Sequence, residues 1–243
     1  MFALLKKEIS SFLSSVIGYI VIIVFLLTLS LFMWVFPGQF NVFDNGYSSI
    51  DTLFIIAPWV FMFLIPAVTM RMFADEKKTG TIELLYTRPL TEMQIILAKY
   101  FASLLLVFIA LVPTLIYFIT VYILGNPAGN IDIAGTVGSY IGLFFLSSAY
   151  VAIGLFASSL TENQIVAFII ALFLCFFCYI GFESLSALNI KGVLANFITL
   201  LGINAHYVSM SRGVIDTRDV IYFISLVAVF ILFTKTVLES RKW

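Results

Sequence analysis

Few residues in this chain are of the types that perform catalysis or bind metals. His206 is the single histidine, and Cys175 and Cys178 are the two cysteines, both within an apolar run. The cysteines share a helical face, but with no further ligands nearby we expect them to be small packing residues. A lone histidine beside Tyr207 is expected to be an interfacial polar residue. The sequence therefore predicts no metal site and no catalytic residue.

One stretch, DEKKTGT from Asp75 to Thr81, superficially resembles a phosphate-binding loop. A P-loop places its glycines before the lysine, so that backbone N–H groups surround the phosphates. Here the only glycine, Gly80, follows the lysines, and the motifs HExxH and GxSxG do not occur. We expect no cofactor on this chain, so any ATP that drives it must be bound by a partner chain.

The composition indicates what kind of molecule carries these residues. Hydrophobic residues make up 62% of the chain and charged residues 11%, whereas soluble domains contain about 25% charged residues. The 26 phenylalanines and 11 tyrosines suit a lipid-facing surface and its headgroup belts. The formal net charge of zero gives no reason to expect a nucleic-acid partner. The expected surroundings are a lipid bilayer.

Six segments are apolar over the roughly 20 residues that a helix needs to cross the hydrocarbon core. Strands of a membrane β-barrel would be about half as long and would alternate polar with apolar residues. We therefore predict an all-α fold, in which residues 1–243 form one transmembrane domain. The predicted spans are 15–36, 52–73, 96–124, 135–159, 163–182 and 217–237.

The basic residues predict the orientation. Ten of the thirteen Lys and Arg residues lie before the first span, between the second and third, or after the last. The positive-inside rule then places both termini in the cytoplasm. The alternative, in which 193–203 spans the bilayer, would move the C-terminus outside. The remaining three basic residues are Lys191, Arg212 and Arg218.

Residues 1–14 form a separate feature. Apolar residues recur there at helical spacing, opposite lysines and serines, as in an amphipathic helix that lies on a membrane surface. A simple helical extension of the first span is the alternative.

The spans themselves contain no Asp, Glu, Lys, Arg or His at their centres. Such residues usually mark ion coupling, so a proton- or sodium-driven transporter is not expected. The fourth span has small residues at one-turn spacing, which permits close approach of a neighbouring backbone. We expect that neighbour to lie in the same chain, although a partner chain would serve as well. The packing residues are Gly138, Gly142 and Gly154.

Polar residues concentrate in the connection 71–99, between the second and third spans. The pattern predicts a short helix from Thr79 to Tyr86, with Glu83 reaching back to the first backbone N–H groups. Thr91 and Gln94 are spaced as a capping box for the next helix. Leu84 and Leu85 would face the cytoplasm and dock into a groove of a soluble partner, or else rest on the membrane surface.

This connection resembles the motif that follows the second helix in membrane subunits of ABC-2-type transporters. The residues that carry the resemblance are Glu76, Gly80, Thr81, Glu83, Leu84, Leu85, Pro89 and Lys99. It extends over nearly the whole chain, with six spans, an amphipathic N-terminal helix and a longer segment before the last span. In detail, residues 206–223 and 235–242 are similar to permease subunits of the gliding-motility ABC transporters of Bacteroidetes.

The resemblance implies a subunit of the bacterial inner membrane that works with two ATPase subunits and a second membrane subunit, expected to be a different chain. The helix at 79–86 would transmit ATPase motion, with Glu76 and Glu83 binding the ATPase or steadying the loop. The segment 183–216 would form the family's re-entrant pair of short helices.

Three functions fit the sequence. The leading one is the permease subunit of an ATP-driven ABC-2-type exporter. The alternative is a membrane anchor that assembles a motility or secretion machine without moving a substrate. An integral membrane enzyme fits least, because no cluster of polar residues could form its site.

Overall fold

The computed structural model describes residues 1–87, 89–186 and 193–240. Within these ranges every regular element is a helix, and six helical stretches are long and apolar enough to cross a membrane. They are Gly18–Val35, Asp51–Lys78, Glu92–Leu124, Ile133–Leu160, Gln164–Ser186 and Thr217–Glu239. The prediction of an all-α bundle with six spans is confirmed. Four of the basic residues counted in the sequence, Arg88, Lys191, Arg241 and Lys242, lie outside the described residues.

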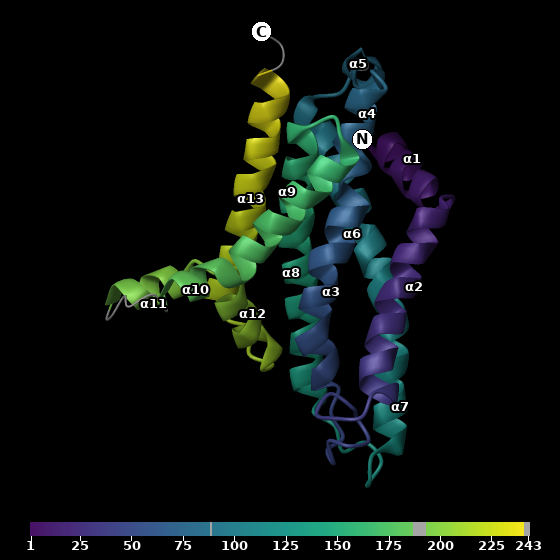
Figure 1. Cartoon of the computed structure of the whole chain (residues 1–243), viewed down its shortest axis with the longest axis vertical. Coiled ribbons are helices and arrows are strands. Elements are labelled where there is room, and N and C mark those ends of the chain that lie inside the picture. Colours follow the sequence, from purple (N-terminus) through teal and green to yellow (C-terminus); the bar gives the residue numbers. More distant parts are fainter. Residues whose placement is uncertain (88, 187–192, 241–243) are drawn as a thin grey trace.

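The first half of the chain forms three of the spans, which lie side by side (Figure 1). Several of them are interrupted, which divides each into more than one element. Pro113 lies in the 3₁₀ turn Val112–Thr114 that interrupts the third span, as expected for a residue that has no N–H to donate. The elements are α1 (Phe2–Leu13), α2 (Val16–Ser30), the π-helical turn Leu31–Val35, α3 (Asp51–Thr69), α4 (Arg71–Lys78), α5 (Thr81–Tyr86), α6 (Glu92–Leu111) and α7 (Leu115–Leu124).

The second half adds three further spans and a group of short helices. The elements are α8 (Ile133–Leu160), α9 (Gln164–Phe176), the π-helical turn Phe177–Gly181, α10 (Phe182–Ser186), α11 (Val193–Leu200), α12 (Ile203–Ser211) and α13 (Thr217–Glu239). Short polar side chains start several of the helices. Asp132, Asn163 and Asp216 each accept a backbone N–H in the first turn of α8, α9 and α13.

Helix α8 forms the centre of the bundle and packs against α3, α9, α12 and α13. Of the 18-residue apolar window in α8, 78% is buried within the chain, against 17% for α13. Glycines allow this close packing. A Cβ on Gly138 would lie 2.7 Å from the Cα of Gly213, and a Cβ on Gly154 would overlap the Thr69 side chain. Gly142 lies against Met210 and Tyr207, so all three glycines face neighbours within the chain.

The N-terminal helix is distinct from the first span. It ends at Leu13, and the Ser15 hydroxyl starts α2 by accepting the Gly18 N–H. Leu4 and Phe12 are buried, and α1 packs mainly against α6. Helix α1 therefore rests on the protein itself and is bent away from α2 (Figure 1).

The start of α1 and the end of α13 lie at one end of the bundle, together with α4 and α5 (Figure 1). We call this the terminal end, and the opposite end, with the connections 36–50 and 125–132, the distal end. The described basic residues of α1 and α4 lie at the terminal end, in accordance with the charge pattern. Helix α11 has only eight residues and projects sideways from the bundle, so it does not cross to the other side.

After α11, the chain returns to the bundle, and α12 packs against it (Figure 1). The Tyr207 hydroxyl donates to the carbonyl of Phe54 in α3, at 2.6 Å. Burial raises the pKa of Tyr207 well above its ordinary value, so the phenol stays protonated and remains a donor. His206 contacts Asp219 through Nδ1 at 2.7 Å and the Leu200 carbonyl through Nε2 at 2.9 Å. It is thus a partnered residue that joins α12 to α13.

Candidate functional site

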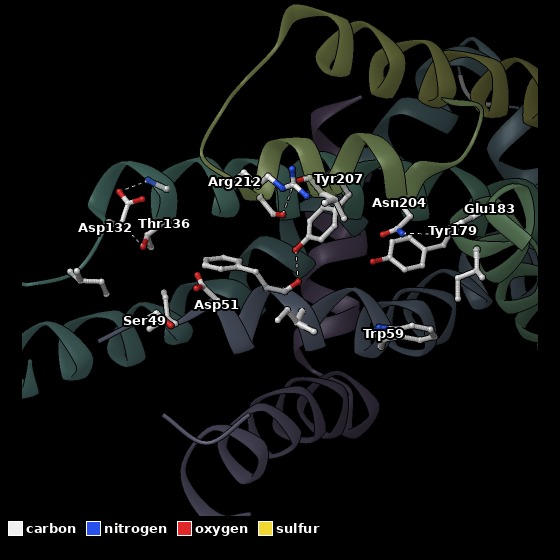
Figure 2. Close-up of a pocket in the computed structure, with 18 of the residues that line it drawn as sticks. Ser49, Asp51, Trp59, Asp132, Thr136, Tyr179, Glu183, Asn204, Tyr207 and Arg212 are labelled. Atoms are coloured by element: carbon white, nitrogen blue, oxygen red, sulfur yellow. Dashed lines mark hydrogen bonds between the residues drawn. The ribbon is translucent and has the colours of Figure 1, made fainter. Parts of the chain in front are cut away.

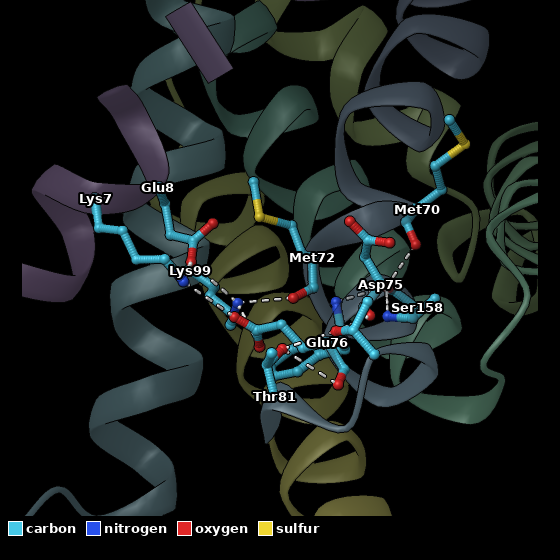
Figure 3. A network of polar contacts seen from close by, with 12 residues as sticks. Lys7, Glu8, Met70, Met72, Asp75, Glu76, Thr81, Lys99 and Ser158 are labelled. Carbon is cyan, nitrogen blue, oxygen red and sulfur yellow. Dashed lines mark hydrogen bonds and ion pairs between the residues drawn. The ribbon is translucent and has the colours of Figure 1, made fainter. Parts of the chain in front are cut away.

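The polar residues of the terminal end converge on α4, which continues the second span beyond Thr69. Ion pairs connect it to α1 and α6 on one side, and it packs against α8 and α9 on the other. Figure 3 shows the side chains that connect these helices. The hydrophobic residues Met72, Phe73 and Ala74 of α4 are buried, so the helix is embedded in the bundle. Any force applied to α4 is therefore shared with four other helices.

Lys99 of α6 is the centre of the contacts on the α1 side. Its side chain is fully buried, and Nζ lies 2.9 Å from Glu76 Oε2 and 3.3 Å from Glu8 Oε1. The same nitrogen donates to the Met72 carbonyl at 2.7 Å. Lys7 adds weaker contacts of 3.5 Å to each carboxylate from an exposed position. We call these four charged residues the Lys99 cluster.

The Lys99 cluster joins three helices that are far apart in the sequence. Glu8 belongs to α1, Glu76 to α4 and Lys99 to α6. A buried lysine is tolerated only where its charge is paired, and removing one partner of a buried pair costs about 3–5 kcal/mol. The Glu76 carboxylate is directed into the chain, where it contacts Lys99 and Lys7.

Helix α4 is held on its other side by the end of α8. The Ser158 hydroxyl accepts the backbone N–H of Phe73 at 3.0 Å and of Ala74 at 3.2 Å, and donates to the Met70 carbonyl at 2.8 Å. No side chain of α4's own N-cap serves these groups. Ser158 thus caps α4 from a different helix, which ties the start of α4 to α8.

Two further contacts extend this attachment. The buried Lys77 ammonium donates to the Ser159 carbonyl at the end of α8. The Gln164 amide, in the first turn of α9, donates to Asp75 Oδ1 at 2.8 Å. The turn between the fourth and fifth spans is therefore joined to α4 through a backbone carbonyl of α8 and a side chain of α9.

Helix α5 extends from α4 at the outermost part of the terminal end (Figure 1). Gly80 links the two helices with a φ of +71°, a conformation that favours glycine. The helix begins at Thr81, slightly later than expected, and no side chain caps it. The Glu83 backbone N–H closes the turn on the Gly80 carbonyl. The predicted hydrogen bond from the Glu83 carboxylate back to the first N–H groups is not seen among the described residues.

The two leucines of α5 do not share one environment. Leu84 is 65% exposed, whereas Leu85 is partly buried against the hydrophobic core. Successive residues on a helix point in directions about 100° apart, which explains the difference. Pro89 is exposed, and the predicted capping box of Thr91 and Gln94 is present at the start of α6. The apolar surface that α5 offers to a partner is thus centred on Leu84.

Sequence reasoning missed three of the residues that hold α4. Glu8 follows Leu4 and precedes Phe12 at intervals of one helical turn, so it lies on the buried stripe of α1. An acidic residue on such a stripe signals a buried partner. Ser158 is one of the small residues of the fourth span, and its spacing indicates only close packing, not a cap for another helix. The hydrogen bond between Asp75 and Gln164 joins two distant parts of the sequence, so no local sequence pattern could have predicted it.

Six spanning helices, with the charged residues gathered in a cluster at one end, define a multi-pass membrane subunit. A family model described as "ABC-2 family transporter protein" matches residues 2–239. The chain therefore belongs to the ABC-2 transporter family, whose members are membrane permease subunits. A search of curated proteins finds no match to the chain.

Proposed function

We propose that this chain is the membrane-spanning permease subunit of an ATP-driven ABC-2-type exporter, and that a separate ATPase acts on α4 and α5. One observation carries the proposal. Helix α4 is bonded to α1, α6, α8 and α9, while α5 continues from it across Gly80 and exposes Leu84 at the outermost part of the terminal end.

The arrangement suits the transmission of a movement from outside the bilayer. A partner that pushes on α5 would displace α4, because only Thr79 and Gly80 separate the two helices. The buried ion pairs and the Ser158 cap would then pass the displacement to α1, α6 and α8. Packed helices with two discrete arrangements are the usual elements of such transitions.

The proposal includes the surroundings of the subunit. The terminal end would face the cytoplasm of a bacterium, with both termini there, and the spans would lie in the inner membrane. The described basic residues of the terminal end support this orientation. The partners would be the ATPase subunit, which alone binds ATP, and a second membrane subunit that is a different chain.

Replacing Leu84 by Glu tests the docking of the ATPase. The exposed side chain makes few contacts within the chain, so Leu84→Glu should leave insertion and thermal stability unchanged and abolish co-purification of the ATPase. Leu160→Glu is the matched control, because Leu160 is an exposed leucine at the same end but outside α5. Normal co-purification of the Leu84→Glu variant would refute docking at α5. A double variant with Leu85→Glu would be less clear, since Leu85 is half-buried.

The resemblance of residues 206–223 to gliding-motility permeases leads us to propose that the exporter serves gliding. Deleting the gene in a gliding bacterium should stop colony spreading, and the unaltered chain should restore it. Reconstitution with the ATPase distinguishes the exporter from the alternative, a non-transporting anchor for a motility or secretion machine. An exporter moves a substrate into vesicles only when ATP is present, whereas an anchor moves none.

A further inference from the structure

A large cleft opens at the distal half of the bundle, far from the Lys99 cluster. Its volume is about 1090 Å³, and its walls come from the start of α3, the start of α8, the turn before α10, and α12. Figure 2 shows the residues that line it. Pockets for small ligands usually have volumes of about 300–1,000 Å³. The cleft is thus large enough for the polar head of a lipid with part of its chains.

One wall of the cleft is apolar and aromatic. Ile55 is 53% exposed and Trp59 is 45% exposed, although both belong to a helix whose other apolar residues are mostly buried. The ring of Tyr179 meets the Trp59 ring edge-on, with the centroids 5.9 Å apart. This wall lies along the side of a span, where acyl chains would be available to cover it.

The remaining walls are polar and carry more negative than positive charge. Asp132 already serves as the N-cap of α8, where it accepts the Gly135 N–H. Glu183 accepts a hydrogen bond from the Asn204 amide at 2.9 Å, which fixes its carboxylate beside the cleft. The Asp51 carboxylate makes no hydrogen bond or ion pair with any residue that the structure describes, and it lines the cleft. Among the described residues that line the cleft, Arg212 supplies the single positive side chain.

We propose that this cleft binds a zwitterionic aminophospholipid, with the phosphate at Arg212, the amine at either Asp51 or Glu183, which lie apart in the cleft, and the acyl chains along Ile55 and Trp59. An ammonium donates three hydrogen bonds and suits carboxylates, whereas guanidinium groups suit phosphate. An anionic lipid without an amine would offer Arg212 the same phosphate but nothing to the two carboxylates. The inference does not depend on ATPase docking, because lipid binding needs no ATP.

Photo-crosslinking of lipids to the full-length chain tests the proposal. The chain, with any subunits that co-purify, is placed in nanodiscs that contain either photoactivatable phosphatidylethanolamine or photoactivatable phosphatidylglycerol. After illumination, the labelled peptides are quantified by mass spectrometry. We expect phosphatidylethanolamine to label the peptides around Ile55–Trp59 and Tyr179–Glu183 at least about threefold more than phosphatidylglycerol, since each exposed charge pair contributes a small preference.

The variant Asp51→Asn with Glu183→Gln should reduce labelling by phosphatidylethanolamine to the level of phosphatidylglycerol. Asp44→Asn is the matched control, because Asp44 is an acidic residue of the same end that does not line the cleft. Equal labelling of the unaltered chain by the two lipids would overturn the proposal, as would an unchanged preference in the double variant. If the double variant does not fold, the comparison of lipids on the unaltered chain still decides.

Discussion

The two ends of this bundle use polar residues in opposite ways. At the terminal end, Lys99 is fully buried and contacts two carboxylates and a carbonyl, and Ser158 makes three hydrogen bonds to α4. At the distal end, Asp51 and Arg212 line an open cleft and are exposed. Charged and polar side chains therefore have two roles in this bundle. At the terminal end they are buried and hold helices together, and at the distal end they are exposed and accessible to a ligand.

The difference has an energetic consequence. A buried charge that loses its partner remains desolvated, whereas an exposed charge that loses its partner is solvated by water. Substitutions at the terminal end should therefore change the free energy of unfolding strongly, and matched substitutions in the cleft should barely change it. Four substitutions test this contrast, in order of decreasing effect.

The largest effect is expected for Lys99→Met. The substitution leaves Glu8 and Glu76 without their common partner and should lower the free energy of unfolding by about 3–5 kcal/mol. Thermal unfolding in detergent measures the change, and Lys78→Met, at an exposed lysine of α4, is the control. Adding Glu8→Gln and Glu76→Gln should recover part of the loss. A change below about 1 kcal/mol would show that the cluster does not fasten the helices.

The next effect is expected for Gly154→Leu. Even a Cβ at this position would overlap the Thr69 side chain, so α8 must move away from the junction of α3 and α4. Overpacking of this kind costs about 1–3 kcal/mol. Val137→Leu, on the exposed face of the same helix, provides the comparison in the same unfolding assay. Equal stability of the two variants would contradict the close packing of α8 against α3.

A smaller effect is expected for Ser158→Ala. The N–H groups of Phe73 and Ala74 would lose the acceptor that caps α4, at a cost of about 0.5–2 kcal/mol. Hydrogen exchange of these two amides should accelerate. Ser159→Ala is a matched control, since the Ser159 hydroxyl donates only within its own helix, to Phe156. Unchanged exchange in the Ser158→Ala variant would mean that α8 does not cap α4.

The smallest effect is expected for Asp51→Asn in the cleft. Its carboxylate is exposed, so the free energy of unfolding should change by less than about 0.5 kcal/mol. Unfolding is measured under the same conditions as for Lys99→Met. A loss comparable to that of Lys99→Met would remove the contrast between the two ends.

Much of the fold follows from the sequence, because about 20 apolar residues can hardly do anything other than span a bilayer. The number of spans and the capping box at Thr91 are both local features. The basic residues also predicted correctly that the described chain ends share a side with α4. These properties depend on neighbours in the sequence and need no knowledge of the packing.

The contacts around α4 could not be predicted in the same way. The sequence indicates only that Lys99 is a basic residue of the connection between the second and third spans. In the structure it belongs to α6 and is buried against α1 and α4. Its partners are 23 and 91 residues away in the sequence, and no local pattern specifies which helices will be adjacent. The differing exposure of Leu84 and Leu85 likewise depends on how α5 is set against α4.

The most direct test is to measure whether α5 and α1 move together as one rigid body. Spin labels at the exposed positions Ser10 of α1 and Thr87, directly after α5, report one distance across the Lys99 cluster by pulsed EPR. If the connection is rigid, the distance distribution should be narrow and the same with and without ATP in the assembled complex. It should become broader in the Lys99→Met variant. A broad distribution in the unaltered chain, or one that shifts with ATP, would contradict a rigid connection between α5 and the bundle.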